Sequence, residues 1–256
     1  MTNTSLLEEF EQYALESSSI LEGALLVARI VEPDTDTSWC RQRIQHLAET
    51  MGEDVSGPRI ARKLKEAGFT GSEEYYKSQN SALEHVLRKR EGIPISLAVV
   101  MLAICEELQL QAHGVNFPSH FLVSVQSTLI DPFSMKLVNE ADCMRWLKDN
   151  NVDTSQAFAM ASRRDIVLRM LNNLGMLASA NNDHARALDI SDYKLAITAD
   201  RFYVNLERVD LWLKLGVNSM ARQDLELAIG HAPDESTRQR LQSKLAVIRE
   251  TSTALH

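Results

Sequence analysis

The residues whose types and spacing could support chemistry lie near the middle of the chain. His120 and Asp131 stand on two consecutive segments that read as strands, and a tight turn near Val125 and Gln126 would place them directly opposite each other. Side chains in opposite positions of antiparallel strands lie about 5 Å apart at Cβ and share a face. This geometry predicts a hydrogen bond between the imidazole and the carboxylate.

No second constellation of this kind is apparent. His85 and His113 do not form a recognised metal-ligand spacing with His120, and Gly92 and Gly114 are isolated glycines, unlike those of a phosphate-binding loop. The sequence therefore predicts no metal and no cofactor. The cysteines have neither metal-site nor redox-motif spacing, and we expect reduced, buried thiols; they are Cys40, Cys105 and Cys143.

The elements that must position the histidine and the aspartate follow from hydrophobic periodicity. Residues 95–108 are apolar on almost every side of a helix, which predicts a central helix enclosed by other elements. After it the period changes, and short runs rich in Val, Phe, Leu and Ile predict three strands. These are residues 112–117, 120–125 and 128–131, with the last two in an antiparallel hairpin.

Flanking segments are predicted to be helical. Residues 6–66 show helical spacing of apolar side chains, and Ser81 with Glu84 has the pattern of a capping box for a helix over 82–90. A further helix over 140–148 contains Trp146. The polar stretch 149–155 predicts a boundary that divides the chain into domains 1–152 and 153–256.

The C-terminal domain is predicted to be helical to its end and to contain an internal repeat. Leu177, Ala187 and Asp200 recur as Leu211, Ala221 and Asp234, each 34 residues later. A period of 34 residues is typical of tetratricopeptide helix–turn–helix units. Two repeats with a last helix over 235–249 need neighbouring structure for stability, so the tail is either a stabilising buttress or a peptide-binding groove.

The segment 80–133 resembles the bacterial SirB family, whose members join a transglutaminase-like core to tetratricopeptide repeats. The resemblance rests on Asn-Ser-Ala-Leu at 80–83, on Val-Leu-Arg-Lys-Arg-Glu-Gly-Ile-Pro at 86–94, on Gly-Val-Asn-Phe-Pro-Ser-His-Phe-Leu-Val at 114–123 and on Ile-Asp-Pro-Phe at 130–133. It implies an α+β fold: a papain/transglutaminase-like core with a small antiparallel sheet against the central helix, a helical N-terminal segment and an all-α, tetratricopeptide-like tail.

The resemblance also implies roles for individual residues. A working site of this kind has a nucleophilic Cys at the start of the central helix, a His base on a strand and an Asp on the next strand that orients the base. His120 and Asp131 fit the last two roles, but Pro94 occupies the position of the Cys. Cys105 lies 11 residues farther along the same helix, about 16 Å away, and cannot replace it.

Ser96 is the hydroxyl nearest to the proline. One hypothesis is a hydrolase or acyltransferase that uses Ser96, His120 and Asp131; the alternative is that Ser96 caps the start of the helix. His120 has alternatives as well, a core histidine bonded to Asp131 or part of a retained binding site with Asn116 and Phe117.

Composition excludes several other classes. A net charge of −8 argues against a general nucleic-acid binder. The most apolar window, residues 93–105, is shorter than the roughly 20 residues of a membrane span, and no secretory signal is apparent, so we expect a cytoplasmic protein.

With the nucleophile missing, the sequence favours a catalytically degenerate protein that binds a protein or peptide partner, basic or neutral, and serves regulation. The hydrolase or acyltransferase, and a purely structural subunit of a larger assembly, remain the alternative hypotheses.

Overall fold

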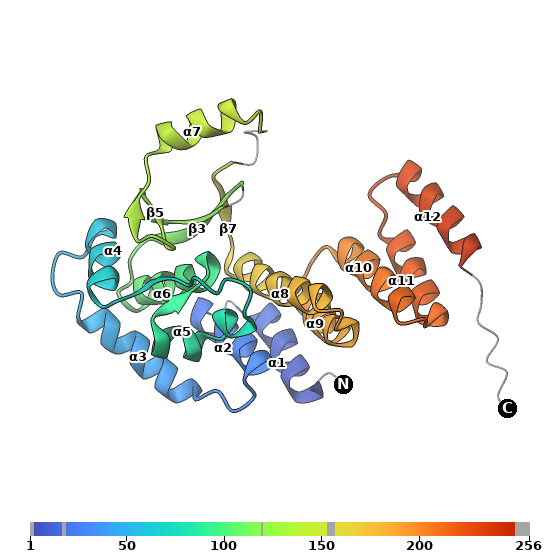
Figure 1. Cartoon of the computed structure of the whole chain (residues 1–256), viewed down its shortest axis with the longest axis horizontal. Coiled ribbons are helices and arrows are strands. Elements are labelled where there is room, and N and C mark those ends of the chain that lie inside the picture. The colour runs from blue at the N-terminus through green and yellow to red at the C-terminus, as the bar shows by residue number, and fades with distance from the viewer. Residues whose placement is uncertain (1–2, 17–18, 119, 153–156, 249–256) are drawn as a thin grey trace. The chain divides into compact units, whose positions relative to one another are not determined.

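The computed structural model describes residues 3–16, 19–118, 120–152 and 157–248 of an α+β chain (Figure 1). The chain forms two compact units, one comprising Gln12–Met170 and the other Met1–Glu11 together with Leu171–His256. The predicted boundary between residues 152 and 153 adjoins residues outside the described ranges and stays a prediction.

Four helices make up the N-terminal segment, as predicted: α1 (Thr4–Leu15), α2 (Ile20–Val31), α3 (Thr37–Glu49) and α4 (Gly57–Glu66). The Ser19 hydroxyl caps α2 by accepting from the Glu22 N–H, and the Asp36 carboxylate caps α3 by accepting from the Trp39 N–H. These bonds satisfy N–H groups that have no partner inside the helix.

The central helix α6 (Pro94–Glu107) is enclosed on all sides, which confirms the prediction from its apolar residues. Every residue from Ile95 to Cys105 is buried, and the helix packs against α2, α3, β3, β4 and α5 (Leu83–Lys89). Pro94 occupies the first turn, where a helix needs no backbone N–H from that residue.

The predicted capping box at Ser81 and Glu84 is wrong. Ser81 ends a short 3₁₀ helix, η1 (Ser78–Ser81), so Ala82 becomes the N-cap of α5 and no side chain caps that helix. The Glu84 carboxylate instead accepts from the Asp36 N–H at 2.7 Å and pairs with Arg88. The tighter turn before the helix removes Ser81 from the capping position.

Beside α6 lies an antiparallel sheet of five strands in the order β6-β5-β4-β3-β7. The three predicted strands are confirmed at their predicted bounds as β3 (Ala112–Phe117), β4 (His120–Val125) and β5 (Thr128–Asp131). The edge strands β6 (Lys136–Leu137) and β7 (Ala159–Ala161) were not predicted, and β7 shows that the chain is not helical throughout after residue 155. A separate parallel pair joins β1 (Thr70–Gly71) to β2 (Glu91–Gly92).

The hairpin between β4 and β5 is confirmed, but its predicted turn is wrong by one residue. Val125 pairs with Thr128, so Gln126 and Ser127 form the turn, both with positive φ. Two such residues match the right-handed twist of the flanking strands. Continuing this register places Asp131 across from Leu122 rather than from His120.

The two faces of the sheet are covered by different helices. Asn116 pairs with Phe121 and Phe117 with His120, so alternation sends the two pairs to opposite faces. Phe117 and Leu122 form a buried cluster with Cys143 and Leu147 of α7 (Glu140–Asp149). Figure 1 shows α7 on one side of β3 and β5, and α6 on the other.

The C-terminal part of the chain is all helical. Its helices are α8 (Arg163–Ala180), α9 (His184–Ile197), α10 (Arg201–Lys214), α11 (Asn218–Gly230) and α12 (Glu235–Val247). In the second unit, Phe10 packs against Tyr193 with ring centroids 4.9 Å apart. In the part of the chain that the structure describes, none of the helices combines the length and apolarity that crossing a membrane requires.

Candidate functional site

His120 and Asp131 line a shallow hollow between the sheet and α7, here called the aromatic hollow. Its volume is about 240 Å³, and most of its lining is apolar. It is lined by Phe117, His120, Leu122, Asp131, Val138, Asp142, Cys143 and Trp146. The structure thus brings the predicted histidine and aspartate to one cavity, together with α7 residues.

Asp131 uses its carboxylate to build a turn. One oxygen accepts from the Phe133 N–H at 2.9 Å, and the other accepts from the Ser134 hydroxyl at 2.6 Å. Among the described residues, the Asp131 carboxylate makes its hydrogen bonds with this turn and not with His120. His120 and Asp131 are diagonal neighbours across β4 and β5, a relation in which the residues lie about 7–8 Å apart.

His120 is exposed at the mouth of the hollow and lies among aromatic rings. Its ring centroid is 6.2 Å from that of Phe117 and 6.5 Å from that of Trp146, which it meets edge to face. The structure therefore does not give His120 the environment of a buried core histidine. It gives His120 that of a surface residue in an aromatic wall.

The start of α6 has a different environment. Ser96 is 1% exposed, and its hydroxyl accepts from the Ile93 N–H and donates to the Ile93 carbonyl, both at 3.1 Å. A Cβ at Gly92 would lie 2.6 Å from the Ser96 oxygen, so only glycine at position 92 leaves room for this cap. The Ser96 hydroxyl is fully occupied by the backbone.

The predicted site residues are therefore divided between two places. His120 and Asp131 lie on the α7 side of the sheet, whereas Pro94 and Ser96 begin the helix that covers the other side. Asn116 is likewise on the other face from Phe117 and His120. Its side chain lies on the α6 side and contacts Arg169 of α8.

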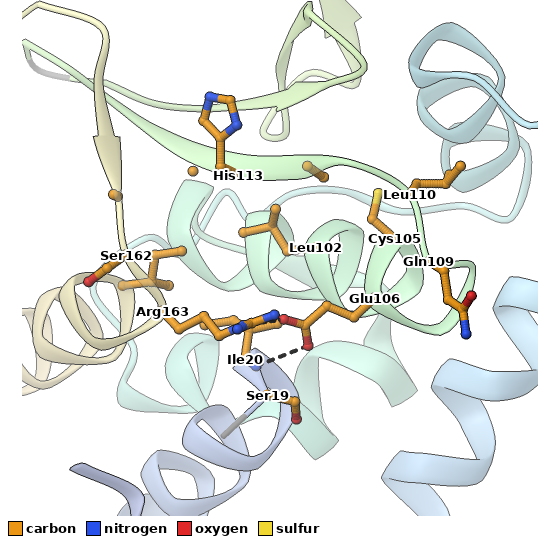
Figure 2. A pocket seen from close by; sticks show the side chains of 14 residues that line it. Ser19, Ile20, Leu102, Cys105, Glu106, Gln109, Leu110, His113, Ser162 and Arg163 are labelled. Atoms are coloured by element: carbon orange, nitrogen blue, oxygen red, sulfur yellow. Dashed lines mark hydrogen bonds and ion pairs between the residues drawn. The ribbon is translucent and has the colours of Figure 1, made fainter. Parts of the chain in front are cut away.

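A second cavity of about 690 Å³ lies at the C-terminal end of α6, between α2, β3, β7 and α8. Its charged groups are satisfied by one another: Glu106 accepts from the Ile20 N–H at 3.1 Å and pairs with Arg163. Figure 2 shows this carboxylate beside Arg163 and Ile20, and the His113 ring turned away from α6. The arrangement joins α2, α6 and α8 through one carboxylate.

All three cysteines are free, as predicted, and lie in the interior. Burial raises the pKa of Cys105 to about 12, with a smaller contribution from Glu106, and burial likewise raises the pKa of Cys40 to about 12. Burial also raises the pKa of Cys143 in the wall of the aromatic hollow. Each thiol is thus held in its protonated, weakly nucleophilic form. In the described ranges, no three His, Cys, Asp or Glu side chains gather as a metal site would require.

The fold places a central helix against an antiparallel sheet. The Phe-Pro-x-His motif joins β3 to β4, and Asp-Pro-Phe begins at the end of β5. These features can be compared with known proteins. A family model described as the transglutaminase-like superfamily matches residues 34–172, more than half of the chain. The chain belongs to the transglutaminase-like superfamily.

Full-length relatives confirm the resemblance to the SirB family. This transglutaminase-like chain is 30% identical to a UPF0162 protein of Xylella fastidiosa, over 82% of this chain and 83% of the relative. It is 23% identical to a UPF0162 protein of Vibrio cholerae, over 94% and 97%, and 21% identical to Protein SirB1 of Salmonella typhimurium, over 98% and 100%. No solved structure matches it significantly.

Sequence reasoning missed two residues that belong to the surroundings of this transglutaminase-like core. Trp146, 38% exposed, faces the aromatic hollow, and Arg169 lies on the other face of the sheet. An aromatic residue on a polar helix such as α7 was the available signal for Trp146. No local pattern marks Arg169, because its contacts are with residues about 50 positions away.

The Ser96→Ala substitution separates a capping role from a catalytic one. Because the Ile93 N–H would lose its partner in a buried place, we expect a loss of about 1 kcal/mol in the free energy of unfolding, measured by urea titration. Ser236→Ala, at an exposed helical position, should change it by less than about 0.5 kcal/mol. Unchanged stability together with loss of a measured turnover would instead identify Ser96 as a nucleophile.

Proposed function

We propose that this chain is a catalytically degenerate transglutaminase-like protein that binds a protein or peptide segment and serves regulation. The observation that carries the proposal is the occupation of the nucleophile position. Pro94 has no reactive group, and the nearby Ser96 hydroxyl is buried with both hydrogen bonds made to Ile93. The hydrolase alternative gains no support from this arrangement.

The binding region we propose is the aromatic hollow. Trp146 supplies apolar surface that remains accessible, and its ring centroid lies 5.8 Å from that of the buried Phe117 behind it. Asp142 is largely exposed at the hollow, where it forms a solvent-exposed pair with Arg145 at 3.0 Å, and Asp131 adds a second carboxylate. Aromatic faces beside carboxylates favour a side chain with an apolar stem and a positive end, because a cation is attracted to both.

We further propose that the helical tail is of tetratricopeptide type. Helix α9 begins at His184 and α11 at Asn218, 34 residues later, and α10 and α12 begin at Arg201 and Glu235 with the same spacing. Asp200 and Asp234 both act as N-caps, at equivalent positions of that period. Such a tail would give a second surface for a partner. Three buried, free cysteines are in keeping with a reducing cytoplasm.

A selection from a random peptide library on the immobilised full-length chain tests the hollow. We expect recovered peptides to carry Lys or Arg next to apolar residues. Trp146→Ala should weaken their binding at least tenfold, because it removes the largest exposed ring of the wall. Leu137→Ala, an exposed apolar residue outside the hollow, is the matched control and should leave affinity within twofold.

Two results would contradict the proposal. One is binding that Trp146→Ala leaves unchanged. The other is conversion of a bound peptide or ester that His120→Ala abolishes, since a degenerate site has no reaction to lose.

A further inference from the structure

Arg169 of α8 is a half-buried cation that has no carboxylate partner among the residues that the structure describes. Its guanidinium carbon lies 5.2 Å from the centre of the Phe121 ring, and one N–H donates to the Asn116 side-chain oxygen across 3.4 Å. Within the described ranges no Asp or Glu oxygen lies within 4.0 Å of it. Burial lowers the pKa of Arg169, as expected for a charge removed from water.

Other arginines of the chain show how such a charge is usually compensated. Arg88 lies over the Trp39 ring at 3.9 Å, a stacking like that of Arg169, but it also pairs with Glu84 at 2.7 Å. The buried Arg208 pairs with two carboxylates. A cation that is partly desolvated and left unpaired raises the free energy of the fold, and Arg169 differs in this respect from Arg88 and Arg208.

The groups around Arg169 are held in place. Asn116 is fixed in β3, where its backbone pairs with Phe121 on one side and Ala159 on the other. Burial lowers the pKa of Arg169, and the electrostatic influence of Tyr75, which is 43% exposed, opposes that shift. The loop that carries Tyr75 is tied by the Asn80 side chain, which donates to the carbonyls of Glu74 and Tyr75 at 2.7 and 3.3 Å.

We propose that Arg169, together with Asn116 and Tyr75, binds a carboxylate from an acidic side chain or chain end of a peptide. A guanidinium has five N–H donors in a planar fork that fits the two oxygens of a carboxylate, and among the described residues only one of these donors makes a hydrogen bond, a long one. The Asn116 NH₂ group and the Tyr75 hydroxyl supply further donors. One positive charge balances a monoanion, and the net charge of −8 disfavours a dianion such as phosphate.

This site does not rest on the proposed function. Asn116 and Phe121 lie on the α6 side of the sheet, whereas the aromatic hollow lies on the α7 side. Loss of binding at one site therefore leaves the other testable by its own variants.

The test is a titration of the ¹⁵N-labelled full-length chain with an acetylated and amidated hexapeptide that has one Glu among glycines, with its single-Gln counterpart, and with inorganic phosphate, all at one ionic strength. We expect the acidic peptide to shift the side-chain N–H signal of Arg169 and the Gln peptide to leave it unchanged. Arg169→Gln should weaken binding of the acidic peptide at least tenfold. Arg88→Gln alters a stacked arginine that already has a carboxylate partner, and it should change the affinity less than twofold.

A second variant covers the case in which Arg169→Gln fails to fold. Asn116→Asp would place a carboxylate beside the guanidinium. It should therefore raise the unfolding temperature, and by competing for Arg169 it should lower the affinity for the peptide at least tenfold. Binding of phosphate without the acidic peptide, equal losses in the Arg169 and Arg88 variants, or unchanged affinity in Asn116→Asp would each overturn the proposal.

Discussion

Replacing Asp224 with Ala is expected to lower the free energy of unfolding by about 3 kcal/mol, the largest effect we predict. Asp224 is 5% exposed, and one of its oxygens accepts from Arg208 Nε at 3.0 Å and from Trp212 Nε1 at 2.8 Å. The substitution would leave the indole N–H without a partner and remove one of the two carboxylates that balance Arg208. Unpaired buried groups keep their full desolvation cost.

The position of this network explains why the effect should be global for the second unit. Arg208 of α10 also donates to Ser191 at 2.7 Å and to Asp192 at 2.6 Å, both on α9, while Asp224 belongs to α11. A single side chain thus joins three consecutive helices. Each helical unit of such an array depends on its neighbours to bury its apolar face.

Urea unfolding followed by helical circular dichroism measures this effect as a lower midpoint of the transition that reports the second unit. Asp210→Ala is the matched control in the same unit, because Asp210 forms a solvent-exposed pair with Lys244 at 3.1 Å, and it should cost less than about 1 kcal/mol. Equal effects of the two substitutions would show that the buried network does not carry the stability assigned to it.

Replacing Gly71 with Ala is expected to lower the free energy of unfolding by about 2 to 3 kcal/mol. A Cβ at this position would lie 2.3 Å from two carbons of the Phe133 ring, closer than real Cβ contacts allow. The ring cannot easily move, because its backbone is tied on both sides. The Phe133 N–H donates to Asp131 at 2.9 Å, and its carbonyl accepts from the Gly71 N–H at 3.0 Å.

A second substitution tests whether the ring contact is the cause. Phe133→Leu in the Gly71→Ala background should recover at least half of the loss, because the smaller side chain makes room for the methyl group. Gly230→Ala is the control, since no atom lies within 4 Å of its added Cβ and the residue is helical, so stability should stay the same or rise slightly. A full loss that persists in the double variant would place the strain elsewhere.

The contacts of residues 131–133 give a structural role to a motif that the sequence suggested as part of a catalytic site. In Asp131-Pro132-Phe133 the aspartate forms the turn and the phenylalanine covers Gly71, which pairs with Gly92 just before α6. The motif therefore secures the turn after β5 against the strand pair that precedes the central helix. The sequence pattern pointed to Asp131 but did not distinguish this role from the orientation of a histidine.

Much of the fold was predictable because it depends on local pattern. An apolar run with no polar side predicted the enclosed helix α6, and the change of period predicted β3, β4 and β5 at their observed bounds. The turn at Gln126 and Ser127 was placed one residue early, because neither residue is a glycine that would mark positive φ. The strand twist selects that turn, and twist is a property of the paired strands.

By itself, the sequence determined the α+β core and the absence of a reactive group at position 94. The sequence motif grouped Asn116 with Phe117 and His120 in one candidate site, whereas the strand register places Asn116 on the opposite face. Only the tertiary structure decided which helix covers each face, and hence that His120 and Asp131 adjoin Trp146 of α7 rather than Ser96 of α6. It also placed Arg169 beside Asn116 and Phe121, with no carboxylate from the described part of the chain. Alternation is fixed by covalent geometry within a strand, whereas the occupant of each face is fixed by packing between segments far apart in the chain.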